Sequence, residues 1–444
     1  MQIVPSPTRG GNSSQLVLMQ LIPMASPPLP LPFQPPSMPQ NVRELGIDKD
    51  LLLGLVLKLG YVSSQFTTEI ASQKIQLPIP LLAELLEELR RENLVEVLGS
   101  SGPLGYRFTL SQKGRDRAMR AFEISGYMGP APVSLEAYTA SVTQQANARP
   151  PVDPRDVARS LSNLTLSEDA RMLAGLAVTG NRSLFVYGPA GNGKTALCLC
   201  LRNSLSTTVW IPHCFAVENQ VVRVFDPQVH ELQPHTGSPV DSRWIQIRPP
   251  LLVAGGELRL QDLDLTFSPT LRFYEAPIQV KANGGVLLID DFGRQQVNPT
   301  QMLNRWIIPM EYHIDYLTLQ TGQKICVPVR QLLLFATNLQ PRDVTDPAFL
   351  RRMGYRLNLT SPNPAQYATI FENYAKRQGV VVPPGVVDGL LNRYQAEHRE
   401  LRCSDSRDLI ERVRDFCRFN DVPFELTPEY LNRAWNGFFG SEDD

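Results

Sequence analysis

The chain has 444 residues, with 43 Lys and Arg against 44 Asp and Glu. At roughly 150 residues per domain this length predicts about three domains. The balanced charge excludes a protein that binds nucleic acid or anionic membranes through a global positive field. The 6 cysteines form no CxxC pair, and no apolar run reaches the ~18 residues of a membrane span. We therefore expect a cytoplasmic protein with free thiols, no thiolate metal site and no membrane span.

Proline is concentrated near the start of the chain, as in the PPLPLP run at 27–32. Proline lacks an amide donor and fixes its own backbone angle, so such runs form neither helix nor sheet ladder. We expect residues 1–40 to be a proline-rich disordered tail.

Residues 41–125 show three short helical patterns and then two strands. Asp48 precedes the first leucine-rich helix, a second helix is expected at 67–72, and Pro80 opens a third. Strands are expected at 95–97 and 106–110, on either side of a glycine-rich tip. Three helices and a two-stranded wing resemble a winged-helix domain.

The charge of the third helix bears on what this domain binds. The helix carries more acidic than basic side chains: Glu84, Glu87, Glu88 and Glu92 against Arg90 and Arg91. Such a surface repels phosphate, so we expect the domain to dock on protein. DNA binding is the disfavoured alternative, and it rests on a basic edge that comprises Arg107, Lys113, Arg115, Arg117 and Arg120.

Residues 126–165 contain the proline-rich stretches GPAP at 129–132 and RPPVDP at 149–154. We expect this segment to be a linker that permits relative motion of the domains.

The apolar run 184–187 leads into GPAGNGKT and then a helical stretch. This is the GxxxxGK[ST] phosphate loop in its strand–loop–helix context, where backbone N–H groups and the helix N-terminus face phosphate oxygens. We expect Lys194 to neutralise the β- and γ-phosphates and Thr195 to ligate Mg²⁺. The expected ATP-binding residues are Gly188, Pro189, Ala190, Gly191, Asn192, Gly193, Lys194 and Thr195.

Two further buried strands end in polar residues. The run 286–289 is followed by Asp290 and Asp291, and the run 332–337 is followed by Asn338. We expect Asp290 to hold Mg²⁺ and Asp291 to orient or deprotonate the attacking water. Asn338 is expected to form a hydrogen bond with the γ-phosphate or with that water.

These motifs in this order resemble the AAA+ ATPase superfamily, over roughly residues 155–440. The resemblance implies Walker A at 188–195, Walker B at 286–291, sensor 1 at Asn338, an arginine finger at Arg351 or Arg352, and sensor 2 at Arg407. It predicts an α/β P-loop NTPase (AAA+) parallel sheet at 166–360 and a helical lid at 361–444, after the small α+β winged helix. Asp291 stands where AAA+ proteins usually have the catalytic Glu.

Two features are similar to those of MoxR-like ATPases. Sigma-54 activators share the first of them, but that branch is disfavoured because the sequence has no GAFTGA loop. Residues 316–319 and 325–327 flank a QTGQ turn and predict a hairpin before the sensor-1 strand. The sequence DFGR at 291–294 is similar to the acidic-x-Asn-Arg stretch of that group, with Gly293 in place of Asn. The segment 208–283 is expected to be an insert, with a hairpin at 210–225 and an apolar run at 251–258.

We therefore expect a magnesium-dependent ATPase that remodels or assembles an unidentified protein partner, chaperone-like, as a homo-oligomeric ring. A finger arginine is useful only when it reaches a neighbouring subunit's γ-phosphate, which is why a ring is expected. The alternatives are an ATP-gated DNA-binding factor and a nucleotide-binding scaffold that hydrolyses little.

Overall fold

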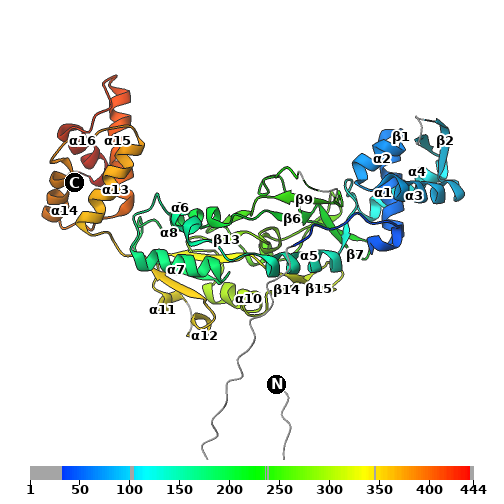
Figure 1. Ribbon diagram of the computed structural model, residues 1–444, viewed down its shortest axis with the longest axis horizontal. Coiled ribbons are helices and arrows are strands. Elements are labelled where there is room, and N and C mark those ends of the chain that lie inside the picture. Colours follow the sequence, from blue (N-terminus) through cyan, green and yellow to red (C-terminus); the bar gives the residue numbers. More distant parts are fainter. Residues whose placement is uncertain (1–32, 101–104, 236, 238–239, 345–346, 441–444) are drawn as a thin grey trace, which may run out of the picture.

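The computed structural model describes residues 33–100, 105–235, 237, 240–344 and 347–440, so most of the predicted tail and the tip of the predicted wing lie outside the described residues. The described chain is elongated (Figure 1). A small N-terminal domain and a C-terminal helical domain stand at opposite ends of an α/β body.

The body is built on a five-stranded parallel sheet in the order β10-β13-β16-β5-β17. Its strands are β5 (Leu184–Tyr187), β10 (Leu251–Ala254), β13 (Val286–Ile289), β16 (Leu332–Thr337) and β17 (Tyr355–Asn358). Leu184 and Val186 of β5 enter one hydrophobic core and Phe185 enters another, so both faces of the sheet are covered. Near-continuous apolar runs are what such doubly covered parallel strands require.

Helices cover this sheet and connect its strands. They are α6 (Pro154–Ser160), α7 (Glu168–Thr179), α8 (Lys194–Leu201), α9 (Ile278–Lys281), α10 (Pro299–Tyr312), α11 (Pro341–Val344) and α12 (Pro347–Leu350). The α/β architecture predicted for this part of the chain is confirmed. The predicted hairpin before β16 is also present, as β14 (Ile314–Thr318) paired with β15 (Lys324–Pro328).

A second sheet lies beside the body, in the order β11-β12-β8-β7-β4. Its strands are β4 (Val133–Ser134), β7 (Cys214–Val217), β8 (Gln220–Arg223), β11 (Thr266–Ser268) and β12 (Phe273–Glu275), and a separate pair joins β6 (Val209–Pro212) to β9 (Trp244–Ile247). The predicted hairpin at 210–225 is therefore shorter, because only β7 and β8 pair with each other. The predicted insert at 208–283 is also interrupted, since β10 belongs to the central sheet.

The N-terminal domain has the element order α1, β1, α2, α3, β2, β3, α4. Their bounds are α1 (Lys49–Ser63), β1 (Gln65–Thr67), α2 (Thr68–Ile75), α3 (Ile79–Arg91), β2 (Val95–Ser100), β3 (Tyr106–Leu110) and α4 (Gln112–Ile124). Asp48 caps α1 through its side chain, as the sequence predicts. The three strands form a sheet in the order β1-β3-β2, of which the sequence indicated only the last two.

The prediction of a linker at 126–165 is wrong. This segment contains β4, α5 (Leu135–Ala148) and α6, and Tyr138 of α5 is fully buried. Gly126 N–H donates to Leu271 O at 3.0 Å, and Lys58 Nζ donates to the carbonyls of Ser125 at 3.0 Å and Tyr127 at 2.6 Å. Burial lowers the pKa of Lys58 to about 8. The prolines at 150–154 lie between two helices, with Pro154 in the first turn of α6. The contacts above fix the N-terminal domain to the second sheet.

The C-terminal domain is a helical unit with its own core. It contains α13 (Pro364–Arg377), α14 (Val386–Ala396), α15 (Cys403–Phe419) and α16 (Pro428–Phe439), which pack around Tyr394 and Trp435.

None of the helices in the described ranges combines the length and apolar character that crossing a membrane needs. The end of the predicted tail is not free, because Asp241 N–H donates to Pro36 O at 3.0 Å.

Candidate nucleotide-binding site

The glycine-rich loop at 188–195 connects β5 to α8, and three of its glycines have positive φ, two of them in close contact with other residues. Gly188 has a φ of 137°, and a Cβ there would lie 2.1 Å from Leu359 O. Gly191 has a φ of 81°, and a Cβ there would lie 2.6 Å from Ser404 Oγ. The loop is thus held tightly against β17 and the C-terminal domain, while Pro189, Ala190 and Gly191 remain exposed to a ligand.

Lys194 is buried at the start of α8. Its Nζ donates to Gly188 O at 2.9 Å and Pro189 O at 2.7 Å, so the side chain folds back under the loop. Burial lowers the pKa of Lys194, and the charges of Asp291 and Asp290 oppose that shift. A buried cation with only carbonyl partners gains from an incoming anion, which the exposed side of the loop can admit.

The two aspartates follow β13 directly. Thr195 Oγ1 donates to the Asp290 carboxylate, with O···O distances of 3.1 and 3.0 Å, and Asp291 N–H donates to Asp290 Oδ1 at 3.0 Å. A hydroxyl and a carboxylate at this separation suit Mg²⁺, which takes one or two protein ligands and completes its shell with phosphate and water. The described residues contain no group of three or more His, Cys, Asp or Glu that would hold a metal without such a ligand.

Asn338 follows β16, which lies between β5 and β13 in the sheet. Ala336 pairs with Val186, and Phe335 pairs with Ile289, so all three strands end at the same edge. The structure therefore brings the phosphate loop, the aspartates and Asn338 together at the carboxyl edge of the sheet. The carboxyl ends of parallel strands are where ligands bind in open α/β sheets.

Gln295 is a site residue that the sequence pattern did not indicate. Its amide Nε2 donates to Asp290 O at 3.0 Å and Asp291 O at 3.3 Å, and its Oε1 accepts from Gly293 N–H at 2.8 Å. Asp291 itself has a φ of 46°, a conformation that Asp tolerates better than most residues. Gln295 therefore holds the turn that carries both carboxylates, although no local motif marks it.

Asn192 and Ser404 join the phosphate loop to the C-terminal domain. Asn192 Nδ2 donates to Ser361 Oγ at 3.2 Å, and its Oδ1 accepts from Cys403 N–H at 3.4 Å. Ser404 N–H donates to Gly191 O at 2.8 Å. The first turn of α15 therefore contacts the loop directly, which the sequence did not predict for Ser404.

Of the three arginines expected from the family resemblance, one lies on the helix that contacts the phosphate loop, and two lie at the opposite end of the sheet. Arg407 lies on α15 but is exposed and paired with Asp408, at 2.9 Å. Arg351 and Arg352 precede β17, at the end of the sheet opposite the phosphate loop, and Arg352 pairs with Glu311 at 3.2 Å. The structure thus separates both residues from the phosphate loop of their own chain.

Comparison with known proteins adds the following. A family model described as a domain of unknown function, DUF8689, matches residues 363–437, within the C-terminal helical domain. No curated protein matches the sequence. Similar solved structures include the RuvB Holliday junction branch migration motor of Thermotoga maritima, at 13% identity and a TM-score of 0.35, covering 65% of this chain and 72% of that one.

Two other solved structures are similar at the same level. NtrX from Brucella abortus in complex with ADP is 13% identical with a TM-score of 0.39, covering 72% of this chain and 65% of that one. A chain of the complex between the magnesium chelatase subunits BchI and BchD is 15% identical with a TM-score of 0.36, covering 65% of this chain and 96% of that one. At such TM-scores these likenesses carry no argument, so the functional case rests on the site residues.

Proposed function

We propose that the chain is an AAA+ ATPase that binds ATP with Mg²⁺ at the carboxyl edge of the central sheet and hydrolyses it to drive a change in a protein partner. The observation that supports this most is the convergence of the loop at 188–195 with Asp290, Asp291 and Asn338. These residues come from three strands that are far apart in the sequence.

Each residue has a distinct role in this proposal. The loop amides and Lys194 would bind the phosphates, while Thr195 and Asp290 would hold Mg²⁺, which neutralises developing charge on the phosphoryl group. Asp291 is exposed beside the loop, where it can accept the proton of an attacking water. Asn338 emerges between the loop and the aspartates, where its amide can orient that water.

The C-terminal domain would respond to the nucleotide. Asn192 and Gly191 already contact the start of α15, so a shift of the loop on phosphate binding is transmitted to this helix. Arg407 is the proposed sensor 2, and it must exchange Asp408 for phosphate to act. A surface ion pair of this kind contributes at most about 1 kcal/mol, so the exchange is inexpensive.

We infer that the working form is a ring of identical subunits. Arg351 and Arg352 lie at the amino edge of the sheet, so neither reaches the phosphate loop of its own chain. A neighbouring subunit that presents its phosphate loop to this edge would receive an arginine finger in trans. The exposure of Arg351 and Arg352 supports such a contact.

We propose that the N-terminal domain is a winged helix that docks on protein. The acidic side chains of α3 are largely engaged in ion pairs, of Glu87 with Arg90 and Glu88 with Lys49. Arg117, part of the basic edge that would favour DNA, is itself paired with Asp50 and Glu92. Apolar side chains are instead exposed on the wing: Val97, Leu98 and Tyr106.

The experiment that tests nucleotide binding compares the wild type with Lys194→Ala in thermal unfolding. Saturation with ATP and Mg²⁺ at about 100 times the dissociation constant stabilises a protein by roughly 2.7 kcal/mol. We expect this stabilisation in the wild type and in the surface control Lys324→Ala, and its loss in Lys194→Ala. Equal ATP-induced shifts in all three proteins would exclude the proposed site.

Partner identity is tested separately with Asp291→Asn, which is expected to hold its partner while ATP stays bound. Proteins that copurify with this variant in an ATP-dependent manner would support remodelling of protein. Steeply salt-dependent duplex DNA binding that Arg115→Gln/Arg117→Gln removes would support the DNA-binding alternative instead.

A further inference from the structure

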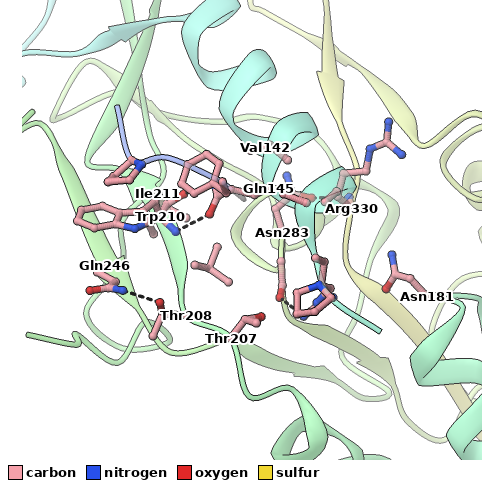
Figure 2. A pocket seen from close by; sticks show the side chains of 18 of the residues that line it. Val142, Gln145, Asn181, Thr207, Thr208, Trp210, Ile211, Gln246, Asn283 and Arg330 are labelled. Atoms are coloured by element: carbon pink, nitrogen blue, oxygen red, sulfur yellow. Dashed lines mark hydrogen bonds between the residues drawn. The ribbon is translucent and has the colours of Figure 1, made fainter. Parts of the chain in front are cut away.

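A pocket of about 600 Å³ lies away from the phosphate loop, at the amino edge of the sheet. Its wall is formed by α5 and β6, by the turns before β5, β13 and β16, and by Phe33 and Pro35 from the N-terminal segment. Figure 2 shows Trp210 and Ile211 at one end, and Asn181 and Arg330 toward the other. Gln246 and Thr208 also lie on the side of Trp210, so polar groups line both ends of the pocket and the Trp210 ring lies at one of them.

The charge of this pocket is not balanced. Arg149 and Arg330 line it, and its lining includes neither Asp nor Glu. Arg149 donates to Gly284 O at 2.9 Å, and the Arg330 guanidinium has no hydrogen bond or ion pair with the described part of the chain. Burial lowers the pKa of both arginines. Arg149 is the more deeply buried of the two, and of the Arg330 guanidinium only Nε is fully buried. An anionic ligand would supply the counter-charge that both side chains lack.

The remaining polar groups suit the same kind of ligand. Asn181 Oδ1 is buried without a partner, and hydroxyl groups of Ser206, Thr207 and Thr208 line the pocket. Guanidinium groups match the tetrahedral oxygens of phosphate with paired hydrogen bonds, and hydroxyl groups add further donors. The volume lies within the range of small-molecule sites, whose walls are mainly apolar with a few converging polar groups.

We propose that this pocket binds a small organic phosphate with an apolar, ring-containing body. The phosphate contacts Arg330 and Arg149, and the ring packs against Trp210. The site is separate from the phosphate loop, because Asn181 precedes β5 whereas Gly188 follows the same strand. The two sites therefore lie at opposite ends of β5, and the inference does not depend on hydrolysis of ATP.

The test measures binding of phenyl phosphate to the full chain by isothermal titration calorimetry. Arg330→Gln is the decisive variant, because its guanidinium has no partner whose loss would disturb the fold. Arg155→Gln makes the same charge change on an exposed side chain and is the matched control. A hydrogen-bonded ion contact is worth enough that its loss weakens binding about tenfold or more.

We expect saturable binding of phenyl phosphate to the wild type and to Arg155→Gln, and at least about tenfold weaker binding to Arg330→Gln. Arg330→Lys, which keeps the charge without the fork, should fall between them. Thermal unfolding of each variant without ligand verifies that it is folded. Benzyl alcohol and benzoate test the headgroup, and neither should bind as tightly as phenyl phosphate. Absence of saturable binding, equal affinity in Arg330→Gln, or equal binding of benzyl alcohol or benzoate would overturn the proposal.

Discussion

The two edges of the central sheet differ in how their polar groups are held. At the carboxyl edge, Lys194 is bonded to two carbonyls and Thr195 to Asp290. The amino edge is less complete, although the same strands form it. It contains four of the eight buried side-chain atoms that lack a partner in the described chain: Asn181 Oδ1, Trp306 Nε1, Arg330 Nε and Gln331 Oε1.

This difference indicates what each edge requires. The carboxyl edge is preorganised by its own hydrogen bonds, which is the condition for electrostatic catalysis without costly rearrangement. The amino edge has donors and acceptors that the chain itself leaves unpaired, so it needs a neighbour or a ligand to complete it. Predictions at the carboxyl edge therefore concern chemistry within one subunit, and predictions at the amino edge concern what that edge supplies to a neighbour or a ligand.

The largest effect is expected at the amino edge. Arg351→Ala/Arg352→Ala should lower ATP turnover by about 10³ to 10⁵-fold, the range measured for arginine fingers. Mixing this variant with Asp291→Asn subunits, which are also inactive alone, should restore activity because some interfaces then pair an intact finger with an intact aspartate. If mixed rings form and remain inactive, the finger does not act in trans.

The next effect concerns the carboxyl edge. Asp291→Asn should retain ATP binding and lose about 10² to 10⁴-fold in turnover, because an amide cannot accept the proton of water. Single-turnover hydrolysis measures this directly, and Asp291→Glu shows whether the shorter side chain limits the rate. Unchanged turnover in Asp291→Asn would mean that the base is another residue.

A smaller loss is expected for Gln295→Ala. The glutamine amide holds the carbonyls of Asp290 and Asp291, so its removal should loosen the turn and lower turnover by about 10 to 100-fold, as for other groups that orient ligands. Gln228→Ala, on an exposed turn, is the control. Equal turnover in both variants would show that the turn is rigid without Gln295.

The smallest effect tests the unpaired charge of the amino edge. Burial and the nearby charge of Arg330 lower the pKa of His313 below its usual 6.5. His313 therefore contributes stability above pH 6.5, and this contribution is lost as the pH falls toward its lowered pKa. Arg330→Gln should raise the pKa of His313 in an NMR titration. An unchanged pKa would show that the Arg330 charge is neutralised by another group.

The sequence predicted those parts of the site that a local pattern encodes. The phosphate loop, the Asp290–Asp291 pair and the hairpin before β16 each lie in one short segment with a characteristic residue order. Their placement at one sheet edge followed from parallel strands alone. The hydrophobic runs also predicted β5, β13 and β16, because strands buried on both faces are apolar throughout.

Long-range contacts could not be predicted in the same way. Gln295 acts through its side-chain amide on carbonyls, and any backbone provides those acceptors, so no residue type marks the contact. The strand β10 could not be assigned to the central sheet, since its pairing with β13 depends on the path of the intervening chain. Proline suggested a linker at 126–165, but burial of Tyr138 outweighed that local preference.

The most direct test of the account is ATP turnover per subunit as a function of chain concentration, with the oligomeric state followed by analytical ultracentrifugation. If each carboxyl edge is completed by the amino edge of a neighbour, turnover per subunit rises as rings assemble and then reaches a plateau. Arg351→Ala/Arg352→Ala should assemble without this rise. Full turnover per subunit in the dilute monomer would contradict the account.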